Sequence, residues 1–67
     1  MNNAVKELIE AIRLQNEADI RINEDSKTIV ILKSPIISPI ILSEKIGGIL
    51  EAFSSYTDYY TIERRVK

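Results

Sequence analysis

Three tyrosines and two arginines fall within the ten residues 56–65 of this 67-residue chain, and they are its most suggestive polar group. Aromatic rings stack on nucleobases and guanidinium groups bind phosphate, so the set is compatible with a small anionic ligand such as a nucleotide or cyclic nucleotide, held between subunits. Tyrosine and arginine are also enriched at the centres of protein–protein interfaces. In a third interpretation, two of the tyrosines pack at the edge of the core and the arginines are exposed to solvent. The candidate ligand-binding residues are Tyr56, Tyr59, Tyr60, Arg64 and Arg65.

Catalytic and metal chemistry find little support in the composition. The chain has serines but no histidine and no cysteine, so no side chain of the usual kind can activate a serine nucleophile. The same absences remove the commonest zinc ligands. We therefore expect a protein that is not an enzyme, with no catalytic residues, no metal and no cofactor.

Length and charge limit the remaining possibilities. A chain of 67 residues forms one domain, residues 1–67, and a domain this small buries only about 60% of its unfolded surface. Hydrophobic residues nevertheless make up 45% of the chain, and without cysteine no disulfide can strengthen the fold. The net charge of -1 disfavours a strong nucleic-acid or membrane-surface field. No signal peptide and no apolar run of about 20 residues is seen, so a cytoplasmic protein without membrane contact is expected.

Periodicity predicts two helices. Val5, Leu8, Ile9 and Ile12 follow the spacing i, i+3, i+4, i+7 and predict a helix over residues 3–16. The same spacing at Ile46, Ile49, Leu50 and Phe53 predicts a second helix over residues 44–54, with Ser43 as its N-cap. This second helix contains Gly47 and Gly48, which suggests either close approach of another backbone or a late helix start.

Alternation predicts the strands. Residues 18–23 alternate between apolar and polar, and with residues 27–33 they form a β-hairpin around a polar turn. A doubled Ser-Pro-Ile-Ile follows, and residues 36–42 are either a further strand or an irregular segment. Residues 56–66, rich in β-formers, predict the last strand. The expected fold is α+β: an antiparallel sheet of three or four strands with both helices on one face, in the order α-β-β-(β)-α-β.

The second hairpin strand and the doubled motif are apolar on both sides, and one molecule this small cannot cover both. The predicted subunit interface consists of Val30, Leu32, Ile37 and Ile41. The leading hypothesis is therefore a non-catalytic binding protein that works as a homo-oligomer, with a C2 dimer as the simplest form. Heavy use of isoleucine is typical of AT-rich genomes, which suggests a phage or mobile-element inhibitor of a host protein. The alternatives are the nucleotide-sequestering protein described above and a nucleic-acid-binding adaptor.

Overall fold

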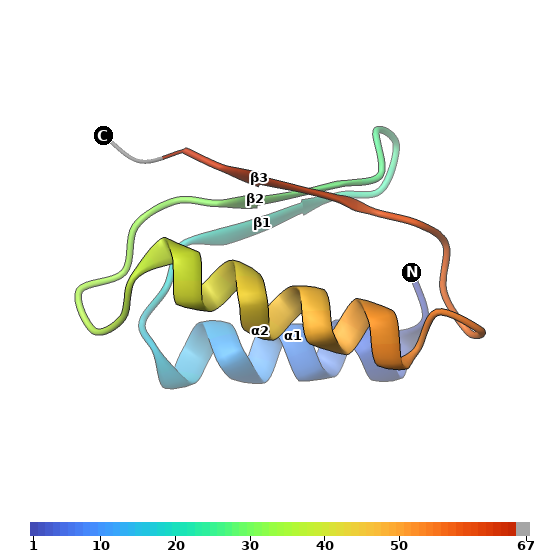
Figure 1. Ribbon diagram of the computed structural model, residues 1–67, viewed down its shortest axis with the longest axis horizontal. Helices are drawn as coiled ribbons and strands as arrows, with labels where there is room; N and C mark the ends of the chain where they lie inside the picture. The colour runs from blue at the N-terminus through green and yellow to red at the C-terminus, as the bar shows by residue number, and fades with distance from the viewer. Residues whose placement is uncertain (66–67) are drawn as a thin grey trace.

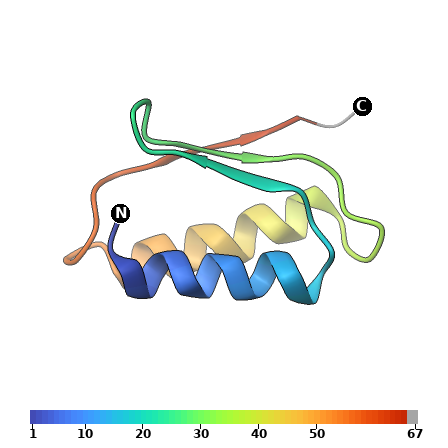
Figure 2. The same ribbon diagram turned by 180° about the vertical axis from the view of Figure 1, so that it is seen from behind.

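The computed structural model describes residues 1–65 and shows two helices packed against one side of a three-stranded sheet (Figure 1). The element order is α-β-β-α-β, so the predicted α+β class with both helices on one face is confirmed. The view from behind shows the same two layers, with no helix on the other side of the sheet within these residues (Figure 2). The elements are α1 (Asn3–Gln15), β1 (Ile20–Asn23), β2 (Thr28–Ile31), α2 (Pro39–Ala52) and β3 (Thr61–Arg64).

Helix α1 begins and ends with local hydrogen bonds that its sequence supplies. The Asn2 side chain accepts a hydrogen bond from the Ala4 N–H at 2.8 Å, which satisfies one free donor of the first turn. At the other end the Ala18 N–H donates to the Arg13 carbonyl and the Glu17 N–H to the Leu14 carbonyl, the two bonds of a Schellman motif. The motif needs a left-handed residue, and Glu17 adopts that conformation with φ of 48°.

Strands β1 and β2 form the expected hairpin. They pair antiparallel, with Ile20 opposite Ile31 and Ile22 opposite Ile29. The Asn23 side chain stabilises the turn, because its oxygen accepts hydrogen bonds from the backbone N–H groups of Asp25 and Ser26. Because side chains alternate along a strand, Ile29 and Ile31 face the helices and are fully buried, whereas Val30 lies on the opposite face.

Helix α2 begins five residues earlier than the sequence analysis expected. Ser38, not Ser43, is the N-cap, and its hydroxyl accepts a hydrogen bond from the Ile40 N–H at 3.1 Å. Pro39 occupies the first helical position, where its missing N–H costs nothing and its fixed φ suits the helix. Residues 36–38 are irregular and 39–42 are helical, so the alternative of a strand over 36–42 is wrong.

Strand β3 is shorter than predicted and runs parallel to β2, so the sheet is mixed rather than antiparallel. Thr28 pairs with Thr61 and Ile31 with Arg64. The direction follows from α2, which returns the chain along the length of the sheet and makes β2, α2 and β3 a β-α-β crossover. Residues 53–60 form the connection from α2 into the strand. Val66, placed in the predicted strand, lies outside the described residues.

The core lies between the sheet and the two helices. Its largest fully buried side chains come from both helices and the central strand: Val5, Ile9, Ile29, Ile31, Leu42 and Ile46. Six such aliphatic side chains contribute on the order of 10 kcal/mol of transfer free energy before the entropy of chain ordering is subtracted.

Candidate functional site

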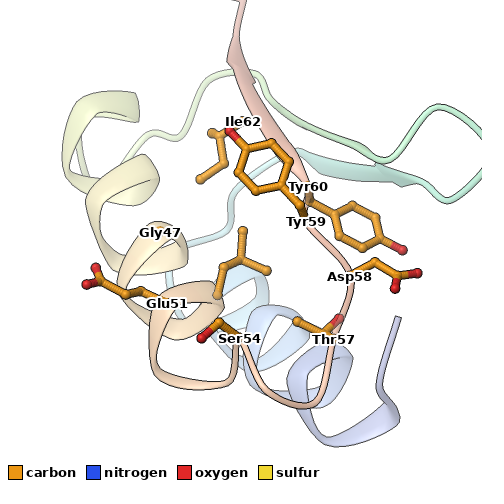
Figure 3. A pocket seen from close by; sticks show the side chains of 9 residues that line it. Gly47, Glu51, Ser54, Thr57, Asp58, Tyr59, Tyr60 and Ile62 are labelled. Carbon is orange, nitrogen blue, oxygen red and sulfur yellow. The ribbon is translucent and has the colours of Figure 1, made fainter.

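A cavity of about 390 Å³ lies between the second half of α2 and the connection that leads into β3 (Figure 3). This volume is at the lower end of the range for small-molecule sites. The helix contributes one wall and the connection with the start of β3 contributes the other. The lining residues are Gly47, Leu50, Glu51, Ser54, Thr57, Asp58, Tyr59, Tyr60 and Ile62.

Two of the three tyrosines belong to this cavity, and they differ in exposure. Tyr60 is buried, with 4% of its surface exposed, and it joins the core. Tyr59 is 86% exposed. Tyr56, also exposed, lies in the turn after α2 and does not line the cavity. The sequence pattern grouped the three rings, but only two of them share a wall.

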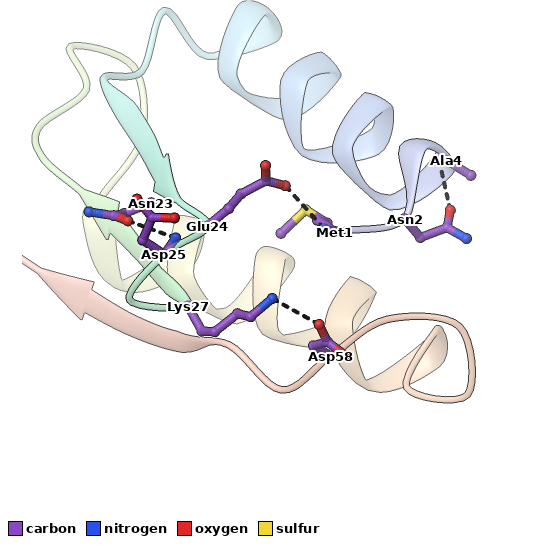
Figure 4. A network of polar contacts seen from close by, with 8 residues as sticks. All are labelled: Met1, Asn2, Ala4, Asn23, Glu24, Asp25, Lys27 and Asp58. Atoms are coloured by element: carbon purple, nitrogen blue, oxygen red, sulfur yellow. Dashed lines mark hydrogen bonds and ion pairs between the residues drawn. The ribbon is translucent and has the colours of Figure 1, made fainter.

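Lys27 holds the connection in place from the hairpin. Its ammonium group donates to the Asp58 carboxylate at 2.8 Å (Figure 4). The same group lies 5.4 Å from the centroid of the Tyr60 ring. The hydrogen bond lowers the pKa of Asp58 below its ordinary value and raises the pKa of Lys27. Because the backbone carbonyl of Lys27 also accepts from the Thr61 N–H, the hairpin turn and the start of β3 are joined twice.

A second exposed ion pair lies near the same end of the sheet. The terminal ammonium of Met1 donates to the Glu24 carboxylate at 3.0 Å, which links the start of α1 to the hairpin turn (Figure 4). That hydrogen bond is the main reason why the pKa of Glu24 is lowered. Both pairs are open to solvent, so they orient the connections more than they stabilise the fold.

The two arginines of the predicted site lie apart from the tyrosines. Neither Arg64 nor Arg65 lines the cavity, and both are exposed. Arg65 donates to Glu63 at 2.9 Å and borders a shallow hollow on the sheet face that the helices leave open. The ionisable side chains that do line the cavity, apart from the tyrosines, are the carboxylates of Glu51 and Asp58. Within one chain, therefore, the predicted anion site is divided between two surfaces.

Two hydroxyl groups beside the cavity lack hydrogen-bond partners. The hydroxyl oxygens of Thr57 and Tyr60 are buried and form no hydrogen bond to any described residue. An unpaired buried hydroxyl costs about 1–3 kcal/mol. Both hydroxyl groups can therefore still donate or accept a hydrogen bond beside the cavity.

The four residues of the predicted subunit interface also fall on two surfaces. Val30 and Leu32 are half-buried, and Val30 lies on the open face of the sheet. Ile37 is half-buried and packs against the core, whereas Ile41 is 47% exposed in the first turn of α2.

Two more exposed isoleucines in that region were not among the predicted interface residues. Ile36 and Ile40 are each 55% exposed, and with Ile41 they place three exposed isoleucines within six residues, named here the isoleucine surface. Pro39 was the sequence signal for their exposure. Proline is favoured at the first position of a helix, so the residues after it follow a helical spacing and not the alternation of a strand. The hydroxyl of Ser34 donates to the Asn16 carbonyl, so the segment that leads into α2 is tied to the end of α1.

Neither helix within residues 1–65 has the length and apolar character needed to cross a membrane. In the same part of the chain, no group of three or more His, Cys, Asp or Glu side chains is placed to hold a metal ion. Comparison with known proteins finds no matching family model, no matching curated protein and no matching solved structure.

Proposed function

We propose that this chain is a non-catalytic interaction protein that works as a homo-oligomer. The observation that carries the proposal is the isoleucine surface, Ile36, Ile40 and Ile41, whose side chains are each about half exposed at one end of the molecule. Contiguous exposed aliphatic side chains are typical of surfaces that bind another protein. The absence of histidine and cysteine supports a binding role rather than a catalytic one.

The energy available from this surface decides how large the contact must be. Full burial of an isoleucine contributes about 1.5–3 kcal/mol, so covering the exposed half of three isoleucines yields roughly 2–4 kcal/mol. Loss of translational and rotational freedom on association costs about 4 kcal/mol or more. The isoleucine surface is therefore one part of a larger contact that includes other parts of the chain.

Sedimentation velocity at low micromolar concentration tests the proposal. We expect a species of at least twice the monomer mass of 7.6 kDa. Ile41→Glu should return it to the monomer, because it places a charge on the isoleucine surface. The variant should still fold, since Glu at this position completes a capping box with Ser38 and suits the positive end of the helix dipole.

The matched control is Tyr56→Ser. Tyr56 is 69% exposed and lies in the turn after α2, at the end of the helix opposite the isoleucine surface (Figure 1). Its substitution should leave the mass unchanged. A wild-type chain that sediments at 7.6 kDa at every concentration up to about 100 µM would end the proposal.

The second candidate function is a sequestering protein for a small anionic ligand such as a nucleotide. The cavity lined by Tyr59 and Tyr60 supports it, but the lining carries carboxylates and no arginine. A second chain would have to bring Arg64 to the tyrosines. A thermal-shift screen with mono-, di- and cyclic nucleotides tests this function, and a shift that persists in Arg64→Ala would count against it.

A further inference from the structure

The outer edge of β3 offers unused backbone hydrogen-bonding groups. The N–H groups of Thr61 and Arg65 donate to carbonyls of Lys27 and β2, each at 2.9 Å. Alternate residues of a strand direct these groups to opposite sides, so the N–H and C=O groups of Ile62 and Arg64 point away from β2. The sheet order ends at β3, and no other strand of residues 1–65 covers this edge. An open edge of this kind is a template for pairing with another strand.

The side of α2 that faces β3 carries a glycine. A Cβ built on Gly47 would lie 3.7 Å from the Ile62 Cδ1 atom, so the glycine faces β3. A Cβ on Gly48 would meet no atom of residues 1–65 within 4 Å beyond its own stretch of helix. Each glycine costs a helix about 1 kcal/mol relative to alanine, and packing within one chain does not account for Gly48. At Gly47 the missing side chain leaves room beside Ile62 for a group from a second chain.

We propose that two copies pair edge to edge through β3, forming a continuous six-stranded sheet with the two α2 helices side by side. This inference rests on the homo-oligomer proposed above and specifies its interface. A two-fold axis makes identical edges antiparallel. Two registers match outward-pointing groups and overlap equally, with Ile62 opposite either Ile62 or Arg64 of the second copy. We choose the second because it places Arg64 beside Ile62, at the cavity of the other copy.

This register brings a free positive charge to a free negative charge. Arg64 shares the helix-facing side of the sheet with Ile62 and forms no ion pair within residues 1–65, and Glu51 likewise has none there. Opposite Ile62 of the second copy, Arg64 enters that copy's cavity, where Glu51 lies one helical turn after Gly47. Arg64 of each copy thus completes the cavity of the other, and the two-fold symmetry gives two such sites.

The same axis brings part of the isoleucine surface beside the second copy. It sets the first half of each α2 against the second half of the other, and at 100° per residue Ile40 lies on the same side of the helix as Gly47, which faces β3. One unfavourable pair results, because Glu63 meets Glu63 of the second copy on the open face. Each of these carboxylates is already bound to its own Arg65 at 2.9 Å, which reduces the repulsion.

Charge-reversal variants, and a double variant that restores the opposite charges, test the interface. The dimer dissociation constant is measured by sedimentation equilibrium. Arg64→Glu and Glu51→Arg should each weaken dimerisation by about tenfold or more, since each places like charges together. The double variant should recover most of the loss. The matched control is Arg21→Glu, an exposed reversal on the opposite edge strand β1, which should leave the dimer constant unchanged.

Single cysteines give an independent measurement because the chain has none of its own. Glu63→Cys places two thiols opposite each other on the two-fold axis, at a Cα separation of about 4.5–5.5 Å, and mild oxidation should link the dimer. Thr61→Cys, on the same face but opposite residue 65, should not link. A dimer that survives both single charge reversals and is not linked through residue 63 would overturn this interface while leaving the homo-oligomer intact. A monomeric wild-type chain would overturn both.

Discussion

Gly48→Ala separates the stability of a single chain from its association. Gly48 lies inside α2, nine residues after the first helical residue and four before the last. Because a Cβ there meets no neighbouring atom within 4 Å, the substitution adds a methyl group without a clash inside the chain. The gain should equal the difference in helix propensity, about 1 kcal/mol in the free energy of unfolding. For a domain of this size the change corresponds to a rise of about 4–8 °C in Tm.

The measurement is urea and thermal unfolding followed by circular dichroism in the Ile41→Glu background, where we expect monomers. Gly47→Ala is the matched control: its methyl group makes an ordinary 3.7 Å contact with Ile62, so it should gain a similar amount. In the wild-type background the added methyl group at Gly48 should leave association unchanged, because Gly48 lies about 100° around the helix from Gly47 and so points away from the β3 edge. An unchanged or lower monomer stability would refute the conclusion that Gly48 is an open helical position.

Three further predictions concern local features. Glu17→Gly should stabilise the chain by about 1 kcal/mol, measured by urea unfolding, because glycine adopts the left-handed conformation at φ of 48° without strain; a loss would contradict the Schellman ending of α1. Ser38→Ala should destabilise by about 1 kcal/mol through loss of the N-cap, whereas Ser43→Ala, inside the helix, should change stability little; the reverse order would place the helix start at residue 44. The pKa of Asp58 is lowered by Lys27 in the folded state, so this carboxylate contributes stability above the unfolded pKa of aspartate, and the contribution is lost as the pH falls through the folded pKa. Unfolding measured from pH 7 to pH 2 should therefore show a smaller acid loss for Asp58→Asn than for the wild-type chain, and added salt should reduce the difference.

The sequence by itself determined the features that depend on near neighbours. The i, i+3, i+4, i+7 stripe of α1 and the alternation of Ile20 and Ile22 predicted a helix and a strand that the structure confirms. The polar turn after Ile22 predicted the hairpin, and two helices with short strands predicted the α+β class. These patterns are readable because a helix or hairpin buries one face of a few consecutive residues.

Only the tertiary structure decided the direction of β3 and the exact start of α2. Strand direction depends on where α2 returns the chain, and a strand of four residues carries no mark of its partner's orientation. Ser38 and Ser43 are equally good N-caps by residue type. The helix begins after Ser38 because Pro39 suits the first helical position and because the earlier start buries Leu42 in the core. The separation of the tyrosines from the arginines has the same origin: neighbours in sequence share a surface only if the fold turns them to the same side. In this chain Tyr60 is buried in the core, whereas Arg65 faces the open side of the sheet.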